Sequence, residues 1–340
     1  MSRILNGAHA DHLEQLPPTR SEPTRAHERC FVGGGQVAVI RRPGPESLLG
    51  VTGPPVLVLG AHRSGTSLVT ELLERLGVFM GRDLDQNREA LFFVRRNEWI
   101  LRHAGGSWEE PERISSLLES DVRKHEALEV LRRQVTSLHW ASFMGRRAWV
   151  QSKLGMQRRS PWGWKDPRNA FTAPLWAELL GGARLICVER NGIDASRSLV
   201  EREAETTRLR EMLPPPEQLL ERGTDPLPFL ISGRSWSFDE AFALWERWVE
   251  ASRRTVDAHA GPSLCLRYED LLEDPESEIG RLAEFCGLEL GPNRDQLVAG
   301  LEQERRYAFL TDPDLRDLYE KFRDSTWMRA LGYGDLSNKR

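Results

Sequence analysis

The feature that most restricts the fold of this chain is a short apolar segment, Pro55–Gly60, which runs directly into a glycine-containing loop and then a helical pattern. A continuous apolar run of this length is typical of a strand buried on both faces of a parallel sheet. After the loop, apolar residues recur at helical spacing until Gly77 ends the pattern. The order strand, loop, helix indicates the first unit of an α/β fold. The helical apolar residues are Leu68, Val69, Leu72, Leu73 and Leu76.

The same alternation recurs twice further along the chain. Ala183–Arg190 and Ser263–Tyr268 have the composition of buried strands. A helical segment follows each of them, at Ile193–Ala204 and at Pro275–Cys286, and Gly287 ends the second. Strands that alternate with helices predict an α/β fold, with a central parallel sheet and helices on both faces.

The remaining stretches define the expected domain organisation. A chain of 340 residues is long enough for two domains, but one α/β domain with insertions fits as well, and we expect one at 54–335. Residues 1–53 lack sustained periodicity and are predicted to be a poorly ordered leader, with a candidate edge strand at 37–40. Insertions at about 85–160, with a long helix around 121–144, and at about 205–236 are expected to cover the carboxyl edge of the sheet.

Charge, hydropathy and cysteine usage exclude several classes of protein. The chain has 47 Lys and Arg against 51 Asp and Glu, a net charge of −4, which disfavours non-specific binding of nucleic acid. The sequence has no run of 18 apolar residues, so it predicts no transmembrane segment. Residues 1–18 lack the apolar core of a secretory signal, and we therefore expect a cytoplasmic protein. The dispersed cysteines predict buried thiols rather than a disulfide or zinc site. They are Cys30, Cys187, Cys265 and Cys286.

The loop Gly60–Ser67 has the features of an anion-binding loop. It opens a helix, where free backbone N–H groups and the helix dipole favour negative charge, and its glycines allow a tight turn. The pattern is similar to GxxxxGK[ST], but Thr66 replaces the lysine, which argues against a nucleotide triphosphatase. Arg63 supplies a guanidinium instead, and with the hydroxyls of Ser64 and Ser67 it predicts a cradle for one 5′-phosphate group.

A second basic unit follows the strand at 183–190. Arg190 ends that strand, and Ser198 lies eight residues later in the second turn of the next helix. Open α/β sheets bind ligands at the carboxyl ends of their strands. This pair is therefore a candidate for holding a second phosphate, although a strand-end arginine alone is more often an ion-pair partner.

Together, the two basic units resemble the sulfotransferase family that uses 3′-phosphoadenosine 5′-phosphosulfate (PAPS). In that family a [KR]SGT core binds the 5′-phosphosulfate, and a later strand–Arg–helix–Ser unit with the same spacing of eight binds the 3′-phosphate. Residues 266–275 look like the family's YEDL…P element, whose tyrosine lies near the nucleotide. The resemblance covers about 54–335 and implies a P-loop-like three-layer fold. The nucleotide-binding residues that it implies are Arg63, Ser64, Gly65, Thr66, Ser67, Arg190, Ser198 and Tyr268.

The resemblance implies in-line transfer of a sulfuryl group to a hydroxyl or amine of a small-molecule, carbohydrate or lipid-linked acceptor, with no metal required. We expect Arg63 and Lys165 to stabilise the negative charge. Lys165 lies in a KDP element that some relatives also have. Some relatives carry an adenine-stacking aromatic soon after the SGT core. Leu68 stands there in this chain, so the stacking residue is not identified. The oligomeric state is not readable from the sequence.

The catalytic base has four candidates. Glu89 is preferred, because some relatives use a glutamate 20–30 residues after the phosphate loop and Glu89 precedes an aromatic pair. Asp85, Asp166 and His62 are the alternatives. Two other functions stay open: a P-loop kinase for a small molecule, which Thr66 disfavours, and a nucleotide-binding protein without catalysis. The tryptophans in or beside the insertions are candidates for an acceptor wall or for the core. They are Trp99, Trp108, Trp140, Trp162, Trp164 and Trp236.

Overall fold

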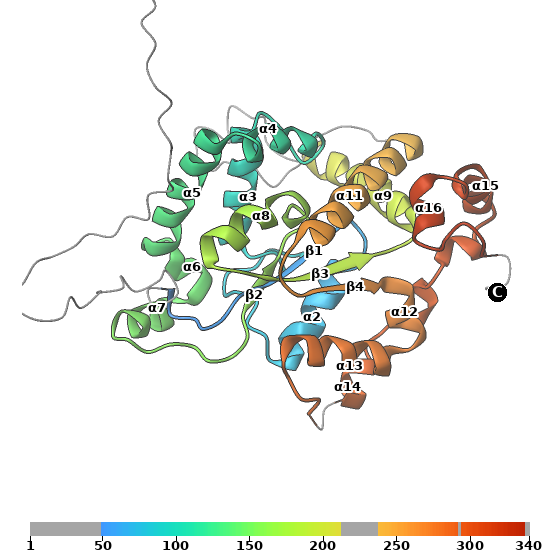
Figure 1. The fold of residues 1–340 in the computed structure, drawn as a ribbon. Helices are drawn as coiled ribbons and strands as arrows, with labels where there is room; N and C mark the ends of the chain where they lie inside the picture. The colour runs from blue at the N-terminus through green and yellow to red at the C-terminus, as the bar shows by residue number, and fades with distance from the viewer. Residues whose placement is uncertain (1–48, 212–236, 292–293, 337–340) are drawn as a thin grey trace, which may run out of the picture. The chain divides into compact units, whose positions relative to one another are not determined.

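A computed structural model of the protein describes residues 49–211, 237–291 and 294–336. Its central sheet has four parallel strands in the order β2-β1-β3-β4 (Figure 1). The α/β class with a parallel sheet, as predicted from the alternation, is therefore confirmed. The strands are β1 (Val56–Gly60), β2 (Gly163–Lys165), β3 (Arg184–Glu189) and β4 (Ser263–Arg267).

Side chains from alternate positions of the strands enter two separate hydrophobic cores. Leu57 and Leu185 lie in the larger core, and Val58 and Ile186 lie in the smaller one on the opposite face. Because all of β1 is buried, the sheet is covered on both sides, as a parallel sheet requires. The fold therefore has three layers.

Helices from distant parts of the chain cover the two faces. Residues of α8 (Asn169–Leu180) and α11 (Phe238–Ala258) belong to the larger core. Residues of α2 (Thr66–Leu76) and α13 (Pro275–Cys286) belong to the smaller one. The two pairs lie on opposite sides of the sheet in Figure 1. Helices on both faces, which the sequence predicted, are confirmed.

The first insertion is helical and packs beside the sheet on the side of the larger core (Figure 1). Its elements are α3 (Leu91–His103), η1 (Pro111–Ile114), α4 (Ser115–Leu118), α5 (Asp121–Thr136), α6 (Trp140–Met144) and α7 (Arg146–Lys153). The other elements are α9 (Gly192–Glu211), α12 (Tyr268–Glu273), α14 (Arg294–Val298), η2 (Gln303–Arg305), η3 (Ala308–Thr311), α15 (Pro313–Phe322) and α16 (Thr326–Ala330).

One predicted helix is wrong in its extent. The long helix expected around 121–144 is divided into α5 and α6 at Ser137. The Ser137 hydroxyl donates to the carbonyl of Gln134 and accepts the backbone N–H of His139. Such local side-chain bonds compete with the helical pattern, so the chain turns there. Most of the leader predicted at 1–53, including the candidate strand at 37–40, and most of the second insertion, at 212–236, lie outside the described residues. The end of that leader is packed against the domain, since Leu49 and Val51 are buried in the larger core and the Leu49 carbonyl accepts the Trp140 Nε1–H.

Three cysteines lie in the described part of the chain, and all are free thiols: Cys187 and Cys286 are buried and Cys265 is half-buried. Cys187 and Cys265 are register partners on β3 and β4. Cys30 lies outside the described residues. Within the described ranges, no helix combines the length and the apolarity that crossing a bilayer requires.

Candidate active site

The loop between β1 and α2 has a backbone that only glycine permits at two points. Gly60 has φ 148°, and a Cβ there would lie 2.3 Å from the carbonyl oxygen of Val188. Gly65 has φ 94°, and its Cβ would lie 2.3 Å from the Tyr268 ring. Gly65 also caps α2 without any side-chain hydrogen bond to the helix, so no side chain shields the first N–H groups of α2 from an anion.

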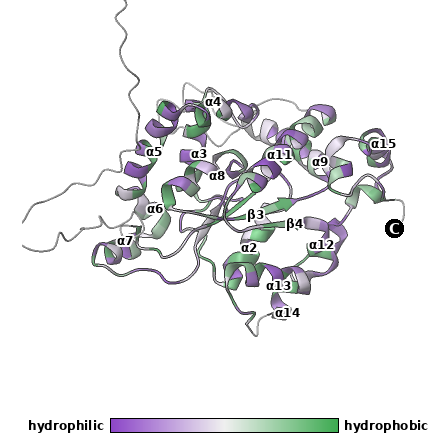
Figure 2. Ribbon diagram, viewed as in Figure 1, coloured by the Kyte–Doolittle hydropathy of each residue, from purple (hydrophilic) through white to green (hydrophobic). Residues whose placement is uncertain are grey.

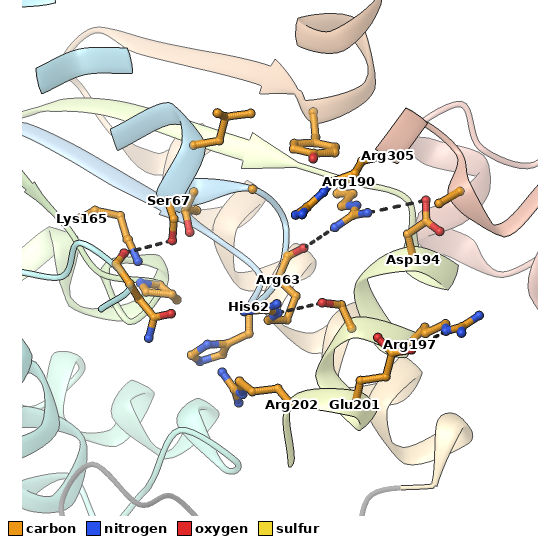
Figure 3. A pocket seen from close by; sticks show the side chains of 18 of the residues that line it. His62, Arg63, Ser67, Lys165, Arg190, Asp194, Arg197, Glu201, Arg202 and Arg305 are labelled. Atoms are coloured by element: carbon orange, nitrogen blue, oxygen red, sulfur yellow. Dashed lines mark hydrogen bonds and ion pairs between the residues drawn. The ribbon is translucent and has the colours of Figure 1, made fainter. Parts of the chain in front are cut away.

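This loop forms one wall of a cavity of about 680 Å³ at the carboxyl ends of the strands (Figure 3). Nine of the ten site residues predicted from the sequence line it. Ser64 does not, because it is buried behind the loop, where its hydroxyl has no hydrogen-bond partner. The nine lining residues are Arg63, Gly65, Thr66, Ser67, Glu89, Lys165, Arg190, Ser198 and Tyr268.

The two basic units that the sequence predicts at the strand ends are joined by hydrogen bonds. Arg63 Nε donates to Ser198 Oγ over 2.8 Å, and Arg190 Nη1 donates to the Arg63 carbonyl over 3.2 Å (Figure 3). The Arg190 guanidinium carbon lies 4.6 Å from the centre of the Tyr268 ring, and its buried Nε has no partner. Arg190 Nη2 also lies 3.8 Å from Asp194 Oδ2, the ion pair that a strand-end arginine commonly forms, so Nε is the donor of Arg190 that has no partner.

The cavity has a positive centre at Arg63. Partial burial lowers the pKa of Arg63 from its ordinary value, and repulsion from the guanidiniums of Arg202 and Arg190 lowers it further. Among the described residues no carboxylate lies within ion-pair distance of Arg63, whereas Arg197, nearby, is paired with Glu201 over 2.7 Å. An anion bound here would relieve the repulsion between these cations.

A buried ion pair lies on the side of the cavity formed by β2. Lys165 Nζ is 2.9 Å from Glu89 Oε1, and the Lys165 side chain is 1% exposed. Arg168 Nη1 lies 3.6 Å from the other oxygen of Glu89. Asp85 accepts the backbone N–H groups of Asn87 and Glu89, each over 2.8 Å, and so fixes the loop that carries Glu89.

The other candidate bases differ in their surroundings. Asp166 does not line the cavity, and its oxygens accept bonds from Arg168 and Asn97. Burial raises the pKa of Asp166 to about 6. Asp85 does not line the cavity either, and burial raises its pKa. His62 does line it, and desolvation and nearby cations hold its pKa well below 6.5.

The comparison with protein families decides the class of this chain. Residues 54–292 match the model of the Sulfotransferase family. The chain belongs to the sulfotransferase family. The match and the parallel sheet together confirm the family and the P-loop-like three-layer fold that the sequence motifs imply. No curated protein matches the chain.

Solved sulfotransferase structures also resemble this one. A sulfotransferase from Alicyclobacillus acidocaldarius is 18% identical, with a TM-score of 0.42, and the match covers 85% of this chain and 100% of that one. The sulfotransferase domain of the Synechococcus PCC 7002 olefin synthase is 20% identical, with a TM-score of 0.37 and coverage of 80% and 89%. A sulfotransferase from Mycobacterium avium is 15% identical, with a TM-score of 0.37 and coverage of 83% and 79%.

Three arginines of this sulfotransferase cavity, Arg197, Arg202 and Arg305, were missed by sequence reasoning. Arg197 directly precedes the predicted Ser198 on α9. Arg202 lies one helical turn after Ser198 on α9, so helical spacing from the predicted Ser198 could have found it. Arg305 lies in η2, far from any motif, and carries no local signal.

Most of the candidate tryptophans belong to the core and not to an acceptor wall. Trp140, Trp162 and Trp164 are fully buried. Trp108 packs edge-on against His62 with ring centres 5.2 Å apart, so it lies directly behind the cavity. Trp99 stacks on the ring of His103, and Trp236 lies outside the described residues.

Proposed function

We propose that this sulfotransferase transfers a sulfuryl group from PAPS to a hydroxyl or amine of a small-molecule, carbohydrate or lipid-linked acceptor. The observation that carries the proposal is the Arg63 guanidinium, which has no carboxylate partner among the described residues and lies beside the start of α2, where no side chain bonds the first N–H groups. The proposed catalytic unit is one domain, residues 54–335, and Leu49 and Val51, just before it, are buried in its larger core.

The proposed donor fits the chemistry of the cavity because PAPS carries negative charge at two positions. The 5′-phosphosulfate would lie at Arg63 and the backbone N–H groups of residues 65–67. The 3′-phosphate would be bound by Arg190, whose Nε has no partner, together with Ser198. Tyr268, under the Arg190 guanidinium, would contact the nucleotide.

The proposed chemistry divides the work between a base and two cations. Glu89 takes the proton from the acceptor hydroxyl while the acceptor oxygen forms a bond to sulfur. The bond between sulfur and the bridging phosphate oxygen breaks, and the adenosine bisphosphate leaves with that electron pair. Lys165 and Arg63 stabilise the charge that develops on the sulfuryl and phosphate oxygens. None of these roles requires a metal ion.

The proposal is tested by incubating the full chain with ³⁵S-labelled PAPS and separate pools of alcohols, amines, glycans and lipid extracts. We expect label in an acceptor and release of an equal amount of 3′-phosphoadenosine 5′-phosphate. Transfer of the labelled phosphoryl group from γ-labelled ATP, with no sulfuryl transfer from PAPS, would instead show that the protein is a small-molecule kinase. Thr66, where the phosphate-loop lysine of kinases stands, argues against that outcome.

A further inference from the structure

The end of the first insertion and the strand β2 after it form a stretch of the chain without any acidic residue. One of its cations, Lys165, is buried at the candidate active site, and the others lie in the insertion. Residues 130–165 hold eight Lys and Arg and not one Asp or Glu, in a chain that contains 51 acidic residues. With a net charge of −4 for the whole chain, the other residues carry −12. Positive charge is therefore concentrated in this segment rather than spread evenly.

The same segment holds most of the large apolar side chains that face solvent. Of the six exposed large hydrophobic residues in the described ranges, five lie between 130 and 156. Leu154 is 72% exposed, Val150 51% and Met156 50%. Single exposed apolar residues are ordinary, but a cluster of them among cations marks an interaction surface.

Helix α7 and the turn after it bring these two kinds of side chain together. On α7, Arg146, Val150 and Lys153 recur at helical spacing on the exposed side, while Ser152 faces inward and is buried. The next residues, 154–159, are all exposed. We call this the α7 surface; it consists of Arg146, Arg147, Val150, Lys153, Leu154, Met156, Arg158 and Arg159.

The cations of the α7 surface differ from most exposed arginines of the molecule in having no acidic neighbour. Arg102 and Arg254 each pair with a glutamate one turn away. Across the part of the chain that the structure describes, no carboxylate pairs with any cation of the α7 surface. Figure 2 shows α7 at the margin of the fold, next to α6.

We propose that the α7 surface binds an anionic lipid bilayer. Exposed arginine and lysine would lie against acidic headgroups, while Leu154, Met156 and Val150 would enter the boundary between headgroups and acyl chains. Charge alone would also suit a nucleic acid, but exposed aliphatic side chains find no partner on a phosphate backbone. The combination therefore favours the lipid surface.

The position of the α7 surface is compatible with catalysis at the membrane. The segment leads into the amino end of β2, whereas the candidate active-site cavity lies at the carboxyl ends of the strands. In Figure 1, α7 lies toward the end of the sheet where β3 starts, away from its arrowhead. A protein docked through α7 would keep its cavity open to water. The inference does not depend on the proposed donor or acceptor.

The test is flotation of the full chain with vesicles of phosphatidylcholine alone or with 30% phosphatidylglycerol. We expect binding only to the anionic vesicles, and weaker binding in 0.5 M salt. The double variant Arg146→Gln/Arg147→Gln should bind about 30-fold more weakly, since each cation near an anionic surface contributes about fivefold. Leu154→Gln/Met156→Gln should weaken binding at least about tenfold.

Matched controls come from elsewhere on the surface. Arg254→Gln/Arg329→Gln removes two exposed but paired arginines, and Val122→Gln removes an apolar side chain that is 69% exposed; both should bind like wild type. Absence of wild-type binding, or equal loss in controls and α7 variants, would overturn the proposal. So would loss of binding in the arginine variant alone, which indicates a purely electrostatic partner. One further result would assign the α7 surface to a second copy of the chain instead of a membrane. In that case the wild type would not bind vesicles, and sedimentation velocity would show a concentration-dependent dimer that only the α7 variants abolish.

Discussion

Arg63 is held in a left-handed backbone conformation, φ 67°, that residues other than glycine rarely adopt. The conformation is supported from outside the loop, because Arg190 donates to the Arg63 carbonyl and Ser198 accepts from Arg63 Nε. Strain of this kind persists only where surrounding contacts impose it, and it is concentrated at functional sites. The arrangement brings two cations from different strand ends to one point of the cavity.

Arg190→Ala should separate the two proposed phosphate positions. Because Arg190 lines the cavity and its nearest carboxylate, that of Asp194, is 3.8 Å away, we expect its guanidinium to bind the 3′-phosphate, so the variant should lose about 10- to 100-fold in affinity for PAPS. Adenosine 5′-phosphosulfate, which lacks that phosphate, should lose much less. Arg197→Ala is the control, since Arg197 lines the same cavity but is paired with Glu201 and Asp312. Calorimetry with both nucleotides decides, and an equal loss for the two would contradict the assignment.

Glu89→Gln should remove the base and leave the donor site intact. We expect turnover to fall by about 10²- to 10⁴-fold, with affinity for 3′-phosphoadenosine 5′-phosphate nearly unchanged. Asp85→Asn is the comparison, because Asp85 only accepts the backbone N–H groups of residues 87 and 89 and does not line the cavity. Steady-state kinetics measure both. Near-normal turnover in Glu89→Gln with a large loss in Asp85→Asn would transfer the role of base to Asp85.

At the scale of elements, the loop before α2 depends on Gly65 for two reasons. Its φ of 94° is unfavourable for a side chain, and an added Cβ would collide with the Tyr268 ring, itself packed under Arg190. Gly65→Ala should therefore cost about 1–3 kcal/mol of stability and also abolish most nucleotide binding. Urea unfolding and calorimetry measure the two effects.

Gly77 offers a matched comparison at the other end of α2. It has φ 103°, but nothing lies within 4 Å of the position of its Cβ. Gly77→Ala should cost about 1 kcal/mol of stability and leave nucleotide affinity unchanged. If both glycine variants lost nucleotide affinity equally, global destabilisation rather than the collision with Tyr268 would explain the effect.

The elements that the sequence predicted well are those with complete local signals. β1 is a continuous apolar run, α2 and α13 have apolar residues at helical spacing, and a glycine marks the end of each. Their observed bounds differ from the predicted ones by two residues at most. β2 was not predicted, because its three residues are too few for a period and its burial comes from pairing with β1. The division between α5 and α6 depends on hydrogen bonds of one serine, which outweigh a continuous helical pattern.

The site follows the same rule. Arg63 and Arg190 are adjacent to strand ends, so motifs and topology together predicted that they meet. Lys165 and Glu89 were predicted separately, but their 2.9 Å contact joins segments 76 residues apart and has no local signal. Arg305 reaches the cavity from a short helix after the last strand, which only tertiary packing determines.

For the whole molecule, the net charge of −4 conceals two positive regions, the cavity around Arg63 and the α7 surface. The ligand that we propose for the cavity is a compact and strongly anionic nucleotide, so the identity of that nucleotide is the point to measure. Calorimetric titration of the full chain with 3′-phosphoadenosine 5′-phosphate and with ATP tests this directly. We expect the 3′,5′-bisphosphate to bind at least about tenfold more tightly than ATP, since only it reaches both proposed phosphate positions. Tight binding of ATP with none of the bisphosphate would contradict it.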